Sequence, residues 1–145
     1  MIELRPISKK YTEILSDNYN MSPEDTDKLI AQSDSELFKD KFFKIYVIMI
    51  EEIVVGTISL YEHSANVVSI GPDIFEEYRL RGYATEAMKA IMDIAKTKGY
   101  KVVFQQIRKN NTASISLHTK LGFETDNCIF KNRNDNEVSI YLKPI

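Results

Sequence analysis

The segment that begins at Glu77 has the residue types of an anion-binding turn. Its sequence, Glu-Tyr-Arg-Leu-Arg-Gly-Tyr-Ala-Thr-Glu-Ala, stands between a strand-like stretch and a long helical pattern. A helix N-terminus presents unpaired N–H groups, and Gly82 lets the backbone approach a phosphate without a Cβ in the way. Arg79 and Arg81 add positive charge, and Ala84 and Thr85 give a small first turn and a hydroxyl. The segment predicts a phosphate site that is neither a P-loop nor a three-glycine dinucleotide loop.

A second stretch, from residue 111 to residue 123, combines a polar and an apolar helix face. Asn111, Ser114 and His118 are spaced i, i+3 and i+7 and therefore share one side of a helix. A separate apolar stripe is formed by Ala113, Leu117 and Leu121. The polar stripe favours ligand contacts by Asn111 and Ser114, although simple helix capping explains Asn111 equally well.

Strand and helix patterns surround these two stretches. Strands are expected at 2–5, 43–50, 53–61, 67–75, 101–107, 123–130 and 138–142. Helices are expected at 8–18, 22–33, 83–98 and 112–121. Gly71 and Pro72 interrupt the strand at 67–75, and proline cannot donate to a β-ladder, so we expect that strand to be distorted in its middle. The pattern indicates a mixed α/β domain.

Two motifs carry a resemblance to a known family. Arg79-x-x-Gly82-x-Ala84 resembles the pyrophosphate loop of the GNAT N-acetyltransferase superfamily. The longer string at residues 76–87 looks like the branch of ribosomal-protein alanine N-acetyltransferases. The block at 111–123 resembles the later Asn-x-x-Ser to Lys-Leu-Gly-Phe block of the same superfamily. The resemblance covers essentially the whole chain and implies one acyl-CoA N-acyltransferase domain over residues 1–145.

The resemblance implies a fold and a cosubstrate. The fold is a central, mostly antiparallel, twisted sheet of about seven strands with a splayed, bulged strand, and about four helices. The cosubstrate is acetyl-CoA, with no metal. Its acetyl-pantetheine end meets the backbone of Ile74 and Phe75, and relatives often carry an aromatic residue where this chain has Pro72. The implied contacts to the rest of the cosubstrate are Arg79, Leu80, Arg81, Gly82, Tyr83, Ala84, Thr85, Asn111 and Ser114.

The implied reaction is direct attack of an amine on the thioester in a ternary complex. The backbone N–H of Ile74 is expected to stabilise the oxyanion. His118 occupies the position where many relatives have a tyrosine acid, and an imidazole is able to protonate the leaving thiolate. Asp73 is a candidate base, although alternation points it to the face opposite Ile74, and Glu62 and His63 are further candidates through water.

The acceptor is expected to be a primary amine, either a small cationic amine or a peptide N-terminus. Acids on the first two helices favour a cationic acceptor: Glu13, Asp17, Glu24, Asp25, Asp27, Asp34 and Glu36. An alternative is a catalytically weak acyl-CoA-binding regulatory domain, because the usual tyrosine is missing. A homodimer is common in the superfamily, and the sequence does not decide this point.

Composition excludes several other classes. The 145 residues hold 19 Lys+Arg and 21 Asp+Glu, a net charge of -2 that argues against a nucleic-acid partner. No apolar run is long enough for a membrane span, no signal peptide is recognisable, and the one cysteine suits a reducing compartment, so we expect a cytoplasmic protein. The charge is uneven: residues 1–77 hold 7 basic and 15 acidic groups (-8), and residues 78–145 hold 12 and 6 (+6).

Overall fold

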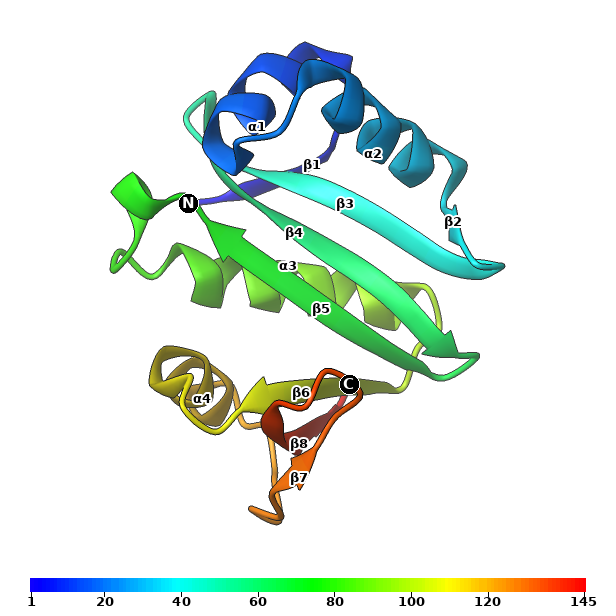
Figure 1. Ribbon diagram of the computed structural model, residues 1–145, viewed down its shortest axis with the longest axis vertical. Coiled ribbons are helices and arrows are strands. Elements are labelled where there is room, and N and C mark those ends of the chain that lie inside the picture. The colour runs from blue at the N-terminus through cyan, green and yellow to red at the C-terminus, as the bar shows by residue number, and fades with distance from the viewer.

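The computed structural model describes residues 1–145 as one open sheet with helices on both faces (Figure 1). The strands are β1 (Glu3–Pro6), β2 (Leu37–Phe38), β3 (Lys41–Ile50), β4 (Ile53–Ser64), β5 (Val67–Ile74), β6 (Val102–Arg108), β7 (Phe130–Lys131) and β8 (Glu137–Pro144). The α-helices are α1 (Thr12–Tyr19), α2 (Pro23–Ser35), α3 (Tyr83–Thr97) and α4 (Thr112–Lys120). Two 3₁₀ turns, η1 (Lys9–Tyr11) and η2 (Glu76–Tyr78), complete the set. No helix is long and apolar enough to cross a membrane.

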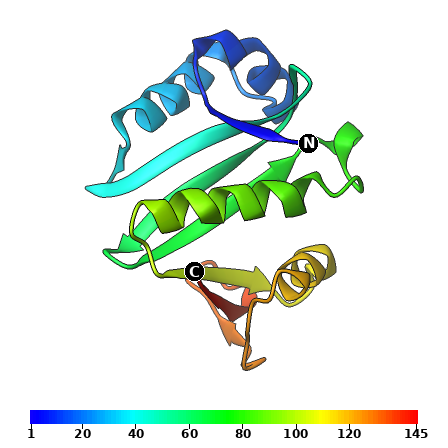
Figure 2. The same cartoon turned by 180° about the vertical axis from the view of Figure 1, so that it is seen from behind.

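The sheet has the strand order β1-β3-β4-β5-β6-β8-β7, with β2 added to β3. Every pair is antiparallel except β5 with β6. Hydrophobic side chains alternate along β3, so that Ile45 and Val47 pack towards α1 and α2 while Tyr46 and Ile48 pack towards α3. The two views in Figures 1 and 2 show α1 and α2 on one face and α3 on the other. The expected mixed α/β class with four helices is confirmed.

The ladder between β4 and β5 is regular where the sequence predicted a distortion. Ile58 faces Pro72 and Ser59 faces Gly71 without a register shift, and the shift in this ladder lies between Glu62 and Ser64. The predicted break at Gly71-Pro72 is therefore wrong for this side of the strand. Proline is tolerated because its missing N–H is on the edge that faces away from β4.

The expected strand at 123–130 is also wrong. Only Glu124 bridges to β8, opposite Leu142, and β7 contains just two residues. Between them, Thr125 Oγ1 accepts from the N–H of Asn127 and Asp126 Oδ1 accepts from the N–H of Cys128. Side chains that bond their own backbone in this way compete with a ladder and make a turn.

The ends of α2 and α3 follow from local chemistry. Ser22 caps α2 by accepting from the N–H of Asp25, with Pro23 in the first helical position. Helix α3 is preceded by Gly82 at φ 81° and followed by Gly99 at φ 96°. Both angles lie in the left-handed region, which glycine occupies at no steric cost. Gly82 lets the chain turn from the loop after β5 into α3, and Gly99 lets it leave the helix towards β6.

Candidate active site

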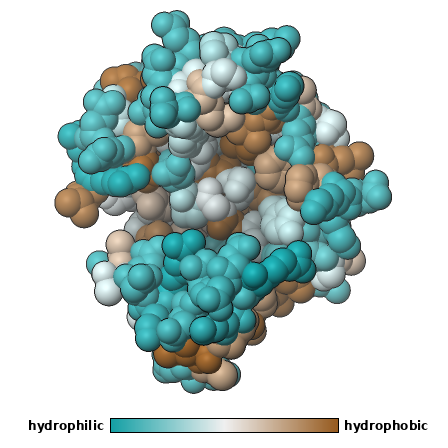
Figure 3. Space-filling view, in the orientation of Figure 1, coloured by the Kyte–Doolittle hydropathy of each residue, from teal (hydrophilic) through white to brown (hydrophobic).

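A cavity of about 950 Å³ opens between β5 and β6, which we call the splay cavity. The two strands pair only through Val67 with Val102 and Val68 with Val103, and then diverge. The residues that line the opening come from β5, the loop after η2, the start of α3, β6 and α4. In Figure 3 the face is hollowed in the middle, with pale and brown side chains in the hollow and teal ones on its rims. The expected splay of this strand is confirmed.

The edge of β5 that faces the cavity offers few free backbone groups. The N–H of Phe75 donates to the carbonyl of Val55 at 2.8 Å, and bonded and non-bonded pairs alternate in an antiparallel ladder. Ile74, opposite Gly56, is thus in a non-bonded pair, and its N–H and C=O point away from β4. Arg79 Nε donates to that carbonyl at 2.9 Å. The N–H of Ile74 keeps no partner within the sheet.

Two other residues of β5 share this edge. The N–H and C=O of Ile70 both bond the side-chain amide of Gln105, at 3.0 and 2.8 Å. Pro72 has no N–H, so only its carbonyl is available. One donor, on Ile74, and one acceptor, on Pro72, therefore remain along the edge of β5.

The outer end of the splay cavity is the N-terminus of α3. Tyr83, Ala84 and Thr85 line the cavity, and their first-turn N–H groups have no intrahelical partner. Together with the helix dipole they make this end attractive to an anion. Leu80 also lines the cavity and has a φ of 63°, so the loop before the helix is tightly turned.

Two residues predicted for the cosubstrate contact lie outside the lining. Phe75 is 4% exposed and packs in the core beneath α1 and α2, with its N–H already bonded to Val55. The guanidinium of Arg81 lies 5.8 Å from the ring centre of Tyr78 and donates to the carbonyl of Glu77. All the other predicted contacts line the cavity: Ile74, Arg79, Leu80, Gly82, Tyr83, Ala84, Thr85, Asn111 and Ser114.

Helix α4 forms the opposite wall. Asn111 Oδ1 accepts from the N–H of Ser114 at 3.1 Å, so this side chain does cap the helix, and it lines the cavity as well. The predicted division of α4 into a polar and an apolar face is only partly correct. Ala113 is exposed and Leu117 lines the cavity, whereas Leu121 joins the core.

His118 lies at the inner end of the cavity and is 3% exposed. Its Nδ1 lies 2.7 Å from the carbonyl of Ser114, which only accepts, so Nδ1 carries the proton. Its Nε2 lies 3.1 Å from Gln105 Nε2, whose oxygen is fixed by the N–H of Ile70, so Nε2 accepts. Burial lowers the pKa of His118, against a smaller opposite effect of the Ser114 bond. This geometry disfavours the predicted role of His118 as the acid, because its Nε2 has no proton to give.

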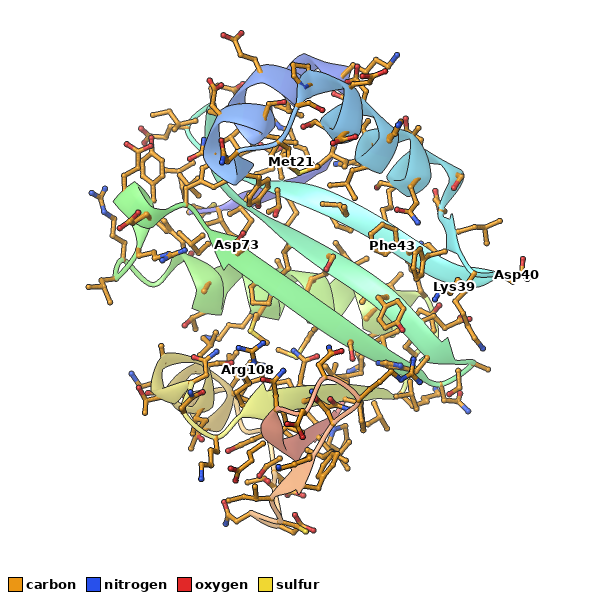
Figure 4. All side chains as sticks on the ribbon, in the orientation of Figure 1. Met21, Lys39, Asp40, Phe43, Asp73 and Arg108 are labelled. Carbon is orange, nitrogen blue, oxygen red and sulfur yellow. The ribbon has the colours of Figure 1, made fainter.

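Asp73 lies at the end of β5, on the face that carries α1 and α2, as alternation predicted. Its carboxylate is 3.9 Å from Arg79 and 48% exposed. Figure 4 shows it at the end of β5, below Met21 of the α1–α2 connection. Tyr19 was not predicted; its hydroxyl bonds Thr57, and burial raises its pKa to about 12, with Asp73 adding to the rise. Asp73 is the acid that the structure brings to this face of the cavity.

A second, smaller cavity of about 290 Å³ lies on the same face, and we call it the aromatic pocket. Its walls are Gln32, Phe38, Phe43, Ser59, Tyr61, Ser69, Ile70 and Gly71. Ser69 and Ile70 also line the splay cavity, so the two cavities share a wall near the point where β5 leaves β6. Figure 4 places Phe43 on β3, on the side of α2.

The remaining candidate bases are engaged with neighbours. His63 Nε2 lies 2.6 Å from Ser69 Oγ, which in turn donates to the carbonyl of Phe104. Glu62 accepts from the hydroxyl of Tyr100 at 2.7 Å. The acids predicted on the first two helices line neither cavity.

Gln105 is the residue at the inner end that sequence reasoning missed. It is 7% exposed and follows the same alternation as buried Val103 and Ile107. A polar residue in an apolar stripe was the available indication, because a buried amide needs partners. Its actual partner, the backbone of Ile70, is 35 residues away in the chain and has no local pattern.

Comparisons with known proteins agree with this geometry. A family model described as an acetyltransferase (GNAT) domain matches residues 4–124. The chain belongs to the GNAT acetyltransferase family. A curated relative, the uncharacterized N-acetyltransferase YobR of Bacillus subtilis (strain 168), is 32% identical over 68 residues, which is 47% of this chain. The match spans about a quarter of that protein, 27% of its length.

Solved structures of acetyltransferases show the same fold. RimL, a ribosomal L7/L12 α-N-protein acetyltransferase in complex with coenzyme A, superposes with a TM-score of 0.86 at 18% identity, covering 99% of this chain and 94% of that one. The microcin C7 self-immunity acetyltransferase MccE with acetyl-CoA and AMP gives 0.82 at 20%, covering 99% and 92%. The ribosomal-protein-alanine N-acetyltransferase of Brucella melitensis gives 0.81 at 17%, covering 99% of each.

Proposed function

We propose that this protein transfers an acetyl group from acetyl-CoA to a primary amine. The observation that carries the proposal is the splay cavity, which joins an anion-attracting helix N-terminus to a strand edge with a free donor and a free acceptor. Coenzyme A has the matching chemistry: phosphates at one end, and a pantetheine arm whose amides can pair with a strand edge. Solved structures of the same fold contain coenzyme A or acetyl-CoA.

The residues present fit this cosubstrate in two parts. The first turn of α3, from Tyr83 to Thr85, would hold the pyrophosphate, with Arg79 beside it. The Pro72 carbonyl and the Ile74 N–H would meet the arm, and Asn111 and Ser114 of α4 would face it from the other wall. Phe75 and Arg81 lie outside the cavity, and the geometry gives them indirect roles in packing and in shaping the loop.

The thioester supplies an acetyl group that an amine can attack, and the protein has to stabilise the charge that develops. The N–H of Ile74 is the one backbone donor left on the open edge, so it is the donor we assign to the oxyanion. Asp73 lies on the acceptor face of β5 and would take the proton of the incoming ammonium. His118, neutral and already bonded at both nitrogens, would hold Gln105 in place and donate no proton.

The acceptor would enter from the face of α1 and α2. The aromatic pocket lies on that face and shares Ser69 and Ile70 as lining residues with the splay cavity. A small cationic amine or a peptide N-terminus fits this arrangement, because Asp73 supplies negative charge at the opening and Phe38, Phe43 and Tyr61 supply apolar walls. The acids of α1 and α2 would act only through the long-range field.

Two observations favour the alternative of a catalytically weak acyl-CoA-binding regulatory domain. Pro72 removes one backbone donor from the open edge, and His118 is buried in its neutral form. Both features reduce the groups available to assist the chemistry, while they leave the anion-attracting first turn of α3 unchanged.

Release of free thiol from acetyl-CoA, measured over a panel of polyamines, amino sugars, short peptides and neutral analogues, tests the proposal. We expect turnover with at least one amine, and a loss of at least about tenfold in kcat/KM in Asp73→Asn. Asp40→Asn, an exposed acid in the turn between β2 and β3 that lines neither cavity, is the matched control and should retain wild-type activity.

The panel has two unfavourable outcomes with different meanings. Binding of acetyl-CoA without turnover of any amine would contradict the proposed enzyme activity and favour the acyl-CoA-binding regulatory domain. Absence of binding to both acetyl-CoA and coenzyme A would overturn the assignment of the cavity itself.

A further inference from the structure

The floor of the aromatic pocket is a rung of the β4–β5 ladder with two very small residues. Ser59 on β4 lies opposite Gly71 on β5, and both line the pocket. A Cβ on Gly71 would meet only Ser59 Oγ within 4 Å, at 2.7 Å, so the rest of the space above the glycine is open. Gly71 is exposed although it lies inside a strand. The two residues therefore leave a hollow in the face of the sheet that carries α1 and α2.

The walls around this hollow are aromatic and are held in place by their neighbours. Phe43 lies opposite Tyr61 in the β3–β4 ladder, and the ring of Phe38 packs against both, with centroids 6.0 and 6.5 Å away. The imidazole of His63 packs edge-on against Tyr61 at 4.7 Å, and its Nε2 bonds Ser69. Three rings around a space of about 290 Å³ form a site for an apolar or aromatic group.

The aromatic pocket lies on the same face as Asp73, the acid that the proposed function assigns to the incoming amine. Asp73 and Gly71 are two residues apart on β5 and point to the same side, roughly 7 Å apart at the rise of a strand. Tyr61 and Phe43 lie one such step further along, level with Ser69 and roughly 13 Å from Asp73. In Figure 4, Asp73 and Phe43 lie towards opposite ends of the strands. A molecule with its nitrogen at Asp73 thus reaches the pocket only with a group some distance along its chain.

We propose that the acceptor is a primary amine with an apolar or aromatic group about 7 to 13 Å from its nitrogen, and that the aromatic pocket binds this group. The inference rests on the proposed function, because that function places the amine beside Asp73. The charges agree with it: the half-exposed carboxylate of Asp73 attracts an ammonium, whereas no charged side chain lines the pocket. An arylalkylamine and a peptide with an aromatic third residue share this chemistry.

Two matched pairs of amines test the spacing, with acetyl-CoA as the donor. Phenylbutylamine is compared with butylamine, and benzylamine with methylamine. We expect the phenyl ring to raise kcat/KM at least about tenfold in the long pair, in keeping with the burial of one ring, and much less in the short pair, whose ring does not reach the pocket. An equal gain in both pairs would contradict the proposed spacing.

A third pair distinguishes the two sources of the same chemistry. Triglycine is compared with a tripeptide of two glycines followed by phenylalanine. A gain in this pair alone assigns the aromatic group to a peptide, and a gain in the long amine pair alone assigns it to a small amine. Absence of a gain in both pairs would overturn the proposal.

Two variants test the pocket itself. Phe43→Ala removes a wall and Gly71→Val fills the floor, so each should abolish most of the gain that the ring gives. Phe42→Ala is the matched control: Phe42 precedes Phe43 on β3 and is also half-buried, but it packs against Tyr100 and lines neither cavity. We expect it to lower the melting temperature and keep the gain. An equal loss of the gain in Phe42→Ala would count against the pocket.

Calorimetry, with and without coenzyme A, separates this inference from the proposed function. If wild type binds phenylbutylamine and the aromatic tripeptide no more tightly than butylamine and triglycine, the role of the aromatic pocket fails. A preference that Phe43→Ala and Gly71→Val both keep would also overturn it, because the ring would then lie elsewhere. If wild type prefers the aromatic ligands but binds neither acetyl-CoA nor coenzyme A, the proposed function fails while the pocket stands.

Discussion

His118 is a histidine whose environment determines its charge. It is buried, it donates from Nδ1, and it accepts at Nε2 from an amide that cannot turn. An added proton on Nε2 would face the NH₂ of Gln105, donor against donor. The pKa of His118 is therefore lowered by burial below the 6.5 of a free imidazole. The same side chain that the sequence offers as an acid serves in the structure as an acceptor.

The lowered pKa predicts a pH dependence of folding. The unfolded chain binds a proton at His118 near pH 6.5 and the folded chain only at lower pH, so the free energy of unfolding falls as pH drops through 6.5. His63, whose pKa is lowered by burial and by Lys41, acts in the same direction. Denaturant unfolding at several pH values between about 7.5 and 5.5 should show a shallower decline in His118→Asn and in His63→Asn than in wild type. A wild-type slope in His118→Asn would contradict the neutral, buried assignment.

Local patterns predicted those cavity-lining residues whose position depends on their own stretch of backbone. Gly82, Ala84 and Thr85 could be placed because an anion turn is a property of a few consecutive residues. Gln105 and Tyr19 could not, because each acts through a contact with a distant strand, Ile70 in one case and Thr57 in the other. The exclusion of Phe75 also required the structure, since it depends on a bond to Val55 in another strand.

Helix α3 has a glycine with positive φ near each of its two ends, and only the first of them lines the splay cavity. Gly82 and Gly99 both have positive φ, and a Cβ at either would meet nothing within 4 Å. Alanine at each position therefore suffers the same backbone strain without a clash. The difference is location: Gly82 lines the splay cavity, and Gly99 lies at the far end of the helix.

The comparison of these two glycines is a prediction about the element. Gly82→Ala and Gly99→Ala should each lose about 1–2 kcal/mol of unfolding free energy, the cost of a left-handed φ for an L-residue. Only Gly82→Ala should also weaken acetyl-CoA binding, because its Cβ would stand where the anion approaches the backbone. Chemical denaturation and calorimetry measure the two effects. Equal binding losses in both variants would show that the glycine acts through helix stability alone.

Element types were easier to predict than element edges. The apolar stripe of α3 and the hairpin of β3 and β4 extend over many residues, so periodicity located them well. The two-residue strands β2 and β7 have no period to detect, and they form because a longer neighbour supplies the partner. Residues 125–128 have a strand-like sequence, and only the hydrogen bonds from their side chains to the backbone show that they form a turn.

The uneven charge of the chain follows its architecture. Residues 1–77, at -8, form α1, α2 and the strands up to η2, whereas residues 78–145, at +6, contain the loop, α3 and α4. The boundary falls where the chain passes from the face that carries α1 and α2 to the anion-attracting end of the splay cavity. A net charge near zero thus combines two regions of opposite sign.

This division predicts that salt weakens the coenzyme A complex. Arg79 is 59% exposed and the helix N-terminus is open to solvent, so their attraction for phosphates is screened as ionic strength rises. Between about 0.1 M and 1 M salt, where the screening length falls from about 10 Å to about 3 Å, the Kd of coenzyme A should rise several-fold. Pantetheine, which has no phosphate, is the matched ligand and should show no such change. Equal salt dependence of the two ligands would contradict an electrostatic outer end.

The edge of β5 that faces the splay cavity has few free backbone donors and acceptors, and this affects self-association. A strand edge inside an open sheet invites a strand from another molecule, which would need a regular row of donors and acceptors. Here Gln105 covers Ile70, Arg79 covers the carbonyl of Ile74, and Pro72 lacks a hydrogen. A foreign strand would find only two usable groups, too few to hold it. The same three residues that line the splay cavity thus protect the protein against edge-to-edge aggregation through β5.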